Sequence, residues 1–154
     1  MRTSVDVHNH LQSLNIKHEL VALSGPIKNS ARLADLVGLE PASIIKALAF
    51  MAGDAPLLAM VPGDRRVDTK KLREAAGGVK IRFATNDEVM NVTGYSVSAT
   101  PPVAWTTPPA AFIDPAVRAN DIVYAAGGDT NMVLKMRSAD LVAATGATVA
   151  DIAE

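Results

Sequence analysis

The spacing of apolar and polar positions predicts five helices, each introduced by a residue that caps helix N-termini. The first begins at Ser4 and places Val7 and Leu11 four residues apart, on one face. The remaining four begin at the caps Asn29 or Ser30, Asp68, Thr85 and Ser138. Thr85 and Glu88 have the spacing of a capping box, in which the hydroxyl accepts from the Glu88 N–H and the carboxylate reaches back.

Short apolar runs of strand length lie between these helices. We predict strands over residues 18–23, 44–51, 56–61, 80–83, 111–113, 122–125 and 132–136. The turn Gly53-Asp54 makes a hairpin of the second and third. Strands and helices mix without strict βαβ alternation, which predicts an α+β fold whose mixed sheet curls towards a barrel, with helices around it. No repeat or linker interrupts the pattern, so we expect one domain over residues 1–154.

Composition excludes several classes of function. The chain has 154 residues, 49% of them hydrophobic, and a formal net charge of −1, so no strong global field favours DNA or a membrane surface. It has no cysteine, which excludes disulfides and thiolate nucleophiles. No apolar run approaches the ~20 residues of a membrane span, and the N-terminus lacks a signal-peptide core. We therefore expect a cytoplasmic location. Only six residues are aromatic, three Phe, two Tyr and one Trp, which does not favour a stacking platform for single-stranded nucleic acid.

Lys46 is the one charged residue in the apolar run 44–51. A buried ammonium is costly unless another group pairs with it, so a lysine in such a run is a candidate for a functional pocket. Two structural explanations stay open. Strand alternation can turn the side chain to solvent, or its aliphatic stem can cross the edge of the core while the ammonium stays in water.

The segment 93–109 breaks the pattern with prolines, a glycine and several hydroxyl groups. Within it, small residues and prolines can hold backbone N–H groups outward at fixed positions, which suits a carboxyl ester or a developing oxyanion. The candidate binding residues here are Gly94, Ser98, Ala99, Thr100 and Pro102. An ordinary surface loop is the alternative.

A second small-residue segment follows the strand predicted over 122–125. Ala126, Gly127 and Gly128 permit close approach of a ligand to the backbone. A hairpin turn explains the adjacent glycines equally well.

Five cations lie within nine residues of the chain. They are Arg65, Arg66, Lys70, Lys71 and Arg73. This local excess of positive charge can contact phosphates although the whole chain is nearly neutral. A solvated helix face is the alternative.

We expect no metal and no cofactor. His8, His10 and His18 are close in sequence but show no metal-ligand spacing such as HExxH. The chain has no G-x-G-x-x-G and no G-x-x-x-x-G-K phosphate loop, and no G-x-S-x-G nucleophile elbow.

Taken in order, the motifs resemble the YbaK/prolyl-tRNA-synthetase-associated domain family of trans-editing aminoacyl-tRNA deacylases. The likeness runs over nearly the whole chain. Its segments are 36–39, 44–48, 68–72, 93–102, 113–114, 123–128, 140–141, 146–147 and 150–153. The order and spacing of these motifs are more specific than any one of them.

The resemblance implies a compact mixed α/β domain with a pocket for the aminoacyl end of tRNA. The family's strand lysine matches Lys46, its glycine-containing loop matches 94–102, and its small-residue-Gly-Gly segment matches 126–128. The chain has Ser98-Ala99 where the family usually has Gly-Gly, and Val103-Ala104 where it has a bulky residue and glycine. Side chains at 98 and 99 can narrow the pocket or tilt the backbone donors, so these changes affect which substrate fits and whether it is hydrolysed.

From this resemblance we expect hydrolysis of the ester that joins a small mischarged amino acid to the tRNA 3′ end. Aminoacyl-tRNA is then the partner, together with an aminoacyl-tRNA synthetase. Lys46 orients the substrate or stabilises negative charge, and loop N–H groups at 98–100 form the oxyanion site. Two alternatives stay open. One is a non-catalytic protein that binds tRNA or a synthetase, and the other is a hydrolase of free amino-acid esters.

Overall fold

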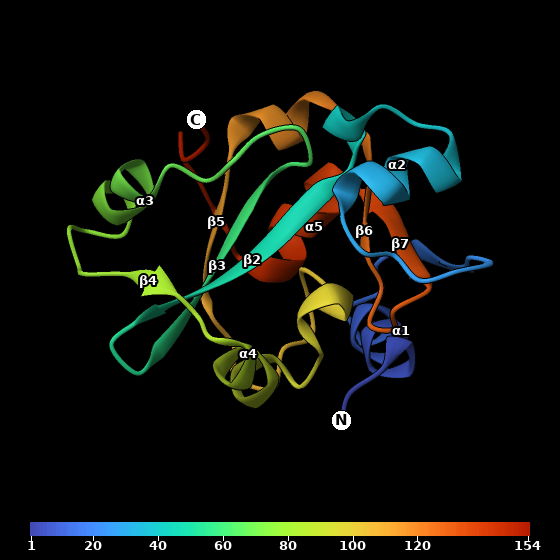
Figure 1. The fold of residues 1–154 in the computed structure, drawn as a ribbon, viewed down its shortest axis with the longest axis horizontal. Coiled ribbons are helices and arrows are strands. Elements are labelled where there is room, and N and C mark those ends of the chain that lie inside the picture. The colour runs from blue at the N-terminus through green and yellow to red at the C-terminus, as the bar shows by residue number, and fades with distance from the viewer.

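The structure is a computed structural model that describes residues 1–154, and its strands form two sheets (Figure 1). The three-stranded antiparallel sheet has the order β1 (His18–Ala22), β7 (Met132–Arg137), β6 (Ile122–Ala126). The five-stranded sheet has the order β4 (Arg82–Phe83), β2 (Ile45–Ala52), β3 (Ala55–Pro62), β5 (Ala110–Ile113), β8 (Thr148–Val149). An isolated bridge between Ile44 and Tyr124 joins the two sheets. The α+β class with a curled mixed sheet is therefore confirmed.

The hairpin of β2 and β3 is the centre of the fold. Gly53 turns it with a φ of 63°, in the left-handed region that favours glycine. β3 alternates between two cores: Leu58 and Met60 face one, and Leu57 and Val61 face the other. β2 and β5 cover both of its edges, and the two cores cover its two faces. Each fully buried Leu or Met side chain contributes about 1.5–3 kcal/mol.

Five α-helices surround the sheets, at the places that the sequence predicts. They are α1 (Ser4–Ser13), α2 (Ser30–Val37), α3 (Thr69–Ala75), α4 (Asn86–Thr93) and α5 (Ser138–Thr145). Three 3₁₀ turns accompany them: η1 (Pro41–Ser43), η2 (Val97–Ala99) and η3 (Pro115–Ala119). Helix α5 lies behind the hairpin in Figure 1, and its Leu141 belongs to the same core as Leu58. None of the helices combines the length and apolar character that a membrane span requires.

The caps Asn29, Asp68 and Thr85 are confirmed, but the two predicted serine caps are wrong. α1 is capped by Thr3, whose hydroxyl accepts from the Val5 N–H while Asp6 completes a capping box. Ser138 is the first residue of α5 and is buried, because β7 runs directly into this helix at Arg137.

Two strands also differ from the prediction. The strand expected over residues 80–83 is reduced to β4, which pairs only with Phe50 and Met51 of β2. The sequence pattern does not predict β8, a two-residue strand that pairs with Phe112 and Ile113. Both are two-residue edge strands, and each forms only by pairing with a strand that is distant in sequence.

Asp114 fixes the C-terminal segment to the core. Its side chain is 3% exposed and accepts three backbone hydrogen bonds, from Ala116 N–H at 2.9 Å, Ile152 N–H at 3.0 Å and Ala153 N–H at 2.9 Å. Its own N–H donates to the Met60 carbonyl at 3.0 Å. Through its backbone N–H and its carboxylate together, Asp114 thus joins β3, η3 and the C-terminal segment.

We predict that Asp114→Ala lowers the free energy of unfolding by about 2–4 kcal/mol, because it leaves buried N–H groups of residues 152 and 153 without an acceptor. Denaturant unfolding measures the loss. Asp35→Ala is the control, since Asp35 is exposed on α2 and makes no side-chain hydrogen bond, and it should change stability by less than about 0.5 kcal/mol. Equal losses in the two variants would contradict the role given to Asp114.

Candidate aminoacyl-binding site

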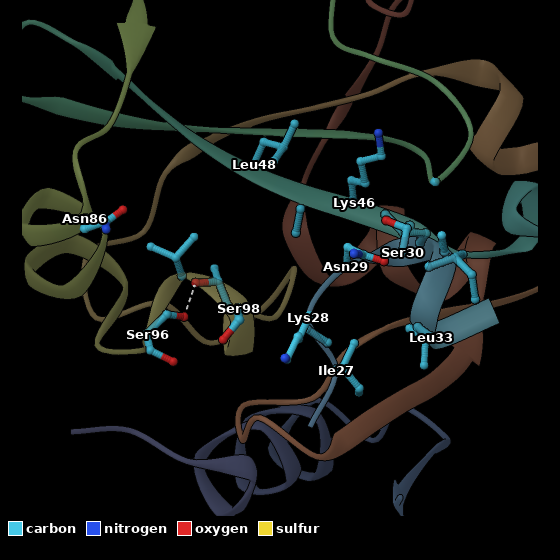
Figure 2. A pocket seen from close by; sticks show the side chains of 18 of the residues that line it. Ile27, Lys28, Asn29, Ser30, Leu33, Lys46, Leu48, Asn86, Ser96 and Ser98 are labelled. Atoms are coloured by element: carbon cyan, nitrogen blue, oxygen red, sulfur yellow. Dashed lines mark hydrogen bonds between the residues drawn. The ribbon is translucent and has the colours of Figure 1, made fainter. Parts of the chain in front are cut away.

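A cavity of about 940 Å³ opens between β2, α2, α4 and the turn η2 (Figure 2). This volume lies in the range typical of small-molecule sites. The segment before α2 and the start of α2 form one wall, β2 forms the second, and α4 with η2 forms the third. Lining residues from these three walls include Ile27, Lys28, Ser30, Leu33, Lys46, Ala47, Leu48, Asn86, Ser96, Val97, Ser98 and Thr100, and Ala126 of β6 also lines the cavity.

One edge of β2 is uncovered at this cavity. The Gly63 N–H donates to the Ile44 carbonyl at 2.7 Å, so even-numbered residues of β2 direct their backbone groups to β3. The Ala84 N–H donates to the Ala49 carbonyl at 3.0 Å, so odd-numbered residues direct theirs to the opposite edge. Because β4 pairs only with residues 50 and 51, the N–H and C=O of Ala47 lie on an open edge. They offer a bound ligand one donor and one acceptor.

Lys46 lines the cavity, and its ammonium is held by one hydrogen bond. The Nζ atom donates to the Arg65 carbonyl at 2.6 Å. Partial burial and the positive charge of Arg66 lower the pKa of Lys46, and Asp64 opposes this shift. Figure 2 shows the side chain projecting from β2 on the side away from Ser98. Lys46 and the loop therefore line the same cavity, but the ammonium is bound to the Arg65 carbonyl on the side away from Ser98.

The loop that follows α4 is held rigidly from inside. The Tyr95 hydroxyl and the Arg2 guanidinium both donate to the Ala104 carbonyl at 3.1 Å. Trp105 Nε1 donates to the Pro101 carbonyl at 2.7 Å. Burial raises the pKa of Tyr95 to about 12, so its hydroxyl remains a donor over the physiological pH range. These bonds fix both ends of the turn η2.

The turn η2 leaves two backbone donors free at the cavity. The Ala99 N–H donates to the Ser96 carbonyl at 3.1 Å, and the Thr100 N–H donates to the Val97 carbonyl at 3.4 Å. The N–H groups of Val97 and Ser98 have no acceptor in the protein, and both residues line the cavity. The free donors therefore lie at 97–98, whereas the family resemblance led us to expect the oxyanion site at 98–100.

The residues that the sequence predicts for substrate binding divide into two groups. Lys46, Ser98, Thr100 and Ala126 line the cavity. Gly94, Ala99, Pro102, Gly127 and Gly128 do not. Gly94 ends α4 with a φ of 86°, and Ala99 is buried beneath η2. Pro102 lines a separate small cavity of about 120 Å³.

The glycine pair has a structural explanation. Gly128 has a φ of 101°, and a Cβ atom there would lie 2.8 Å from the Ser4 nitrogen. Its N–H donates to the Ala99 carbonyl at 3.0 Å. A Cβ on Gly127 would lie 3.0 Å from the Met132 carbonyl oxygen. These glycines let the turn between β6 and β7 pack against the start of α1. The same turn contacts η2 through the hydrogen bond from Gly128 to Ala99.

Sequence reasoning missed most of the wall formed by α2. Lys28 and Ser30 line the cavity, and Leu33, expected only as a core residue, also borders it. On α4, Asn86 contributes an exposed side-chain amide. The one available signal is the cap at Asn29, which places a helix start here but does not show what that start faces.

The cationic segment lies along the connection from β3 to α3 and on α3. Arg65, Arg66, Lys70 and Arg73 are exposed and form no ion pair. Lys71 differs, because its Nζ donates to Asp151 at 3.1 Å and to the Ala153 carbonyl at 3.0 Å. Lys70 and Arg73 are therefore the α3 cations that can contact a ligand without breaking an existing bond.

Two of the three histidines meet at the surface. His8 Nδ1 of α1 lies 2.9 Å from His18 Nε2 of β1. The second ring nitrogen of His18 lies 2.8 Å from the Ile16 carbonyl. No third His, Cys, Asp or Glu joins the pair into a group able to hold a metal ion.

The model of the aminoacyl-tRNA editing domain matches residues 24–144, which include all three walls of the cavity. The chain belongs to the aminoacyl-tRNA editing domain family.

This editing domain also resembles individual proteins. A solved structure described as that of a proposed trans-editing enzyme for prolyl tRNA synthetase superposes with a TM-score of 0.89 and 31% identity, covering 98% of this chain and 96% of that one. The uncharacterized protein YwhH of Bacillus subtilis (strain 168) is 24% identical over 88% of this chain and 86% of its own length. A proline–tRNA ligase of Maridesulfovibrio salexigens is 34% identical over 46% of this chain, which matches 12% of the ligase.

An ion pair fixes the α4 wall of the editing domain to β4. Arg82 Nη1 and Nη2 donate to the two carboxylate oxygens of Glu88 at 2.6 and 2.8 Å. The Thr85 N–H donates to the same carboxylate at 2.9 Å, which completes the predicted capping box. The hydrogen bonds from Arg82, and then the one from Thr85, lower the pKa of Glu88 to about 2.

We predict a pH-dependent effect of Glu88→Gln on stability. The folded carboxyl has the lower pKa, so the ionised form stabilises the protein above about pH 4.5, and this contribution is lost as the pH falls towards 2. The variant should melt at a lower temperature than the wild type at pH 7, and the difference should shrink at pH 4 and again at pH 3. Glu40→Gln is the control, because Glu40 is exposed without a side-chain cap bond. A difference that is constant with pH would contradict the assignment.

Proposed function

We propose that this editing domain hydrolyses the ester bond between a small, wrongly attached amino acid and the 3′ end of a tRNA. The observation that carries the proposal is the open cavity of about 940 Å³, lined by Lys46 on one wall and by the free N–H groups of Val97 and Ser98 on another. Membership in the editing-domain family supports it. The loop does not fill the cavity, so the site is open to a ligand.

The proposed reaction uses water as the nucleophile. Water attacks the ester carbonyl carbon, the bond from this carbon to the ribose oxygen breaks, and the ribose oxygen leaves with a proton. The free hydroxyl of the terminal ribose assists by orienting the water. The products are the free amino acid and a tRNA with both terminal hydroxyls. No protein nucleophile and no metal takes part in these steps.

Negative charge develops on the carbonyl oxygen when water adds. The N–H groups of Val97 and Ser98 are held by a rigid turn, so they can donate to this oxygen without reorganisation. We propose that Lys46 leaves the Arg65 carbonyl when substrate binds and places its positive charge near the same oxygen or the ribose. Holding ester, water and donors in one geometry lowers the barrier by several kcal/mol.

The amino acid itself is expected to lie between α2 and the open edge of β2. The apolar side chains of Ile27 and Leu33 suit a short aliphatic side chain. The Ala47 carbonyl on the open strand edge can accept from the α-ammonium group. Exposed Ser98 narrows the entrance relative to glycine, which favours a small substrate.

A panel of mischarged tRNAs tests the proposal, beginning with tRNA for proline because of the relatives named above. We predict that the wild type releases one small amino acid and that Lys46→Ala lowers kcat/KM by about 100-fold, the scale of losing one charge-stabilising donor. Lys80→Ala is the control, since Lys80 is exposed and lies outside the cavity. Binding of tRNA without turnover of any substrate would identify a binding protein. Turnover of simple amino-acid esters at the same rate would identify a small-molecule hydrolase.

The cationic segment is proposed to bind the acceptor arm. Two or three phosphate contacts from this segment correspond to a slope of about −2 to −3 in log affinity against log salt. Lys70 and Arg73 are exposed on α3 and lie three residues apart, so they share a helix face. The other predicted contacts are Arg65, Arg66 and Lys71.

We predict that the double substitution Lys70→Ala and Arg73→Ala weakens tRNA binding and flattens the salt slope. Hydrolysis of a minimal aminoacyl-adenosine should stay nearly unchanged, because neither residue lines the cavity. Lys17→Ala with Arg118→Ala removes the same charge from other exposed positions and is the matched control. Normal tRNA affinity with an unchanged slope in the α3 variant would show that the acceptor arm docks elsewhere.

A further inference from the structure

A narrow apolar slot continues from the aminoacyl cavity towards β4. It has a volume of about 110 Å³, and five of its lining residues also line the cavity. These shared residues are Ala47, Leu48, Asn86, Val97 and Thr100. The slot alone adds Ala49, Phe83, Ala84 and Val89. The two spaces are therefore parts of one binding region, wide at α2 and narrow at β4.

Phe83 at the end of the slot is the one exposed aromatic side chain among Phe, Tyr and Trp. It is 56% exposed, whereas Phe50, Tyr95, Trp105 and Phe112 are buried. Its ring packs on that of Phe50, with centroids 4.4 Å apart and an angle of 31° between the planes. An aromatic ring supported from beneath and open to solvent is the arrangement that proteins use to stack a nucleobase.

We propose that the slot binds the base of the terminal adenosine of the tRNA, stacked against Phe83. The proposal rests on the function proposed above, because it takes the substrate to be an aminoacyl ester on that adenosine. Only the ribose separates the ester from the base. An ester held at Val97 and Ser98 therefore has its base within the reach of one sugar, and the slot shares Val97 with the cavity.

The amino-acid side chain is the competing occupant of the slot. The base fits better for two reasons. The exposed amide of Asn86 borders both spaces and can bond to the edge of a base. The second apolar wall, at Ile27 and Leu33, remains available for the amino-acid side chain on the opposite side of the ester.

The stacking role also agrees with the composition of the chain. Six aromatic residues are too few for a surface that stacks a run of single-stranded nucleic acid. A single base needs only one exposed ring. Recognition of one terminal nucleoside, with the remaining tRNA contacts made by cations, is consistent with a nearly neutral protein that has one exposed aromatic side chain.

The test compares a non-hydrolysable aminoacyl-adenosine amide with the corresponding amino-acid methyl ester, which lacks the nucleoside. We expect Phe83→Leu to weaken binding of the amide by about 5- to 100-fold, the range of one lost base–aromatic stack. Phe83→Tyr keeps the ring and should bind within about threefold of the wild type. Val149→Ala, which removes another exposed apolar side chain outside both spaces, should bind normally.

Wild-type protein gives an independent measurement, which does not depend on how a variant folds. Addition of adenosine 5′-monophosphate should shift the NMR signals of the Phe83 ring protons upfield, because a stacked base lies over them. Amide binding by Phe83→Leu equal to that of the wild type, or unshifted ring signals at saturating nucleotide, would overturn the proposal. Loss of binding of the methyl ester to the same extent would assign the slot to the amino-acid side chain and would also overturn it.

The two proposals can fail separately. If no mischarged tRNA is hydrolysed but the amide binds in a Phe83-dependent manner, the proposed hydrolysis fails and the base site stands. If mischarged tRNA is hydrolysed and Phe83→Leu binds the amide normally, the hydrolysis stands and the base site fails.

Discussion

The uncovered edge of β2 is the constraint on which the site depends. An edge of a sheet exposes backbone donors and acceptors that elsewhere would pair with another strand. Here β4 covers only two residues of that edge, and α2, α4 and η2 stand around the rest without filling it. The space between them is the cavity. A longer β4 would satisfy the Ala47 backbone groups and close the site.

The parts around this edge differ in how firmly they are held. The loop that carries Val97 and Ser98 is fixed by the Ala104 carbonyl, which accepts bonds from Tyr95 and Arg2. The ammonium of Lys46 makes a single bond to a carbonyl in the turn after β3. Fixed backbone donors would suit the proposed hydrolysis, because donors that need no reorganisation stabilise developing charge most.

The departures from the family pattern fall where the structure accommodates them. Ala99 is 3% exposed and does not line the cavity, whereas exposed Ser98 does. Ala104, where the resemblance implies glycine, has a φ of 62°, in the left-handed region. Such a conformation costs an alanine about 1–2 kcal/mol. The two hydrogen bonds to its carbonyl hold it there.

Several features follow from local sequence because the interactions that form them are local. The cap at Asn29, the capping box of Thr85 and Glu88, and the hairpin at Gly53 each involve residues within a few positions of one another. The absence of cysteine excludes thiol chemistry in any fold. Lys46 could be singled out because a charge within an apolar strand is conspicuous without knowledge of the fold.

Only the tertiary structure decided what each element faces. The wall formed by Lys28 and Leu33, the exposure of Phe83 and the pairing of Lys71 with Asp151 all depend on segments far apart in sequence. The sequence shows the glycines at 127–128, but whether they meet a ligand or another backbone is set by the position of α1. Sequence patterns report which residues prefer burial and where the chain turns. Which surfaces meet is fixed by long-range packing, which no local pattern encodes.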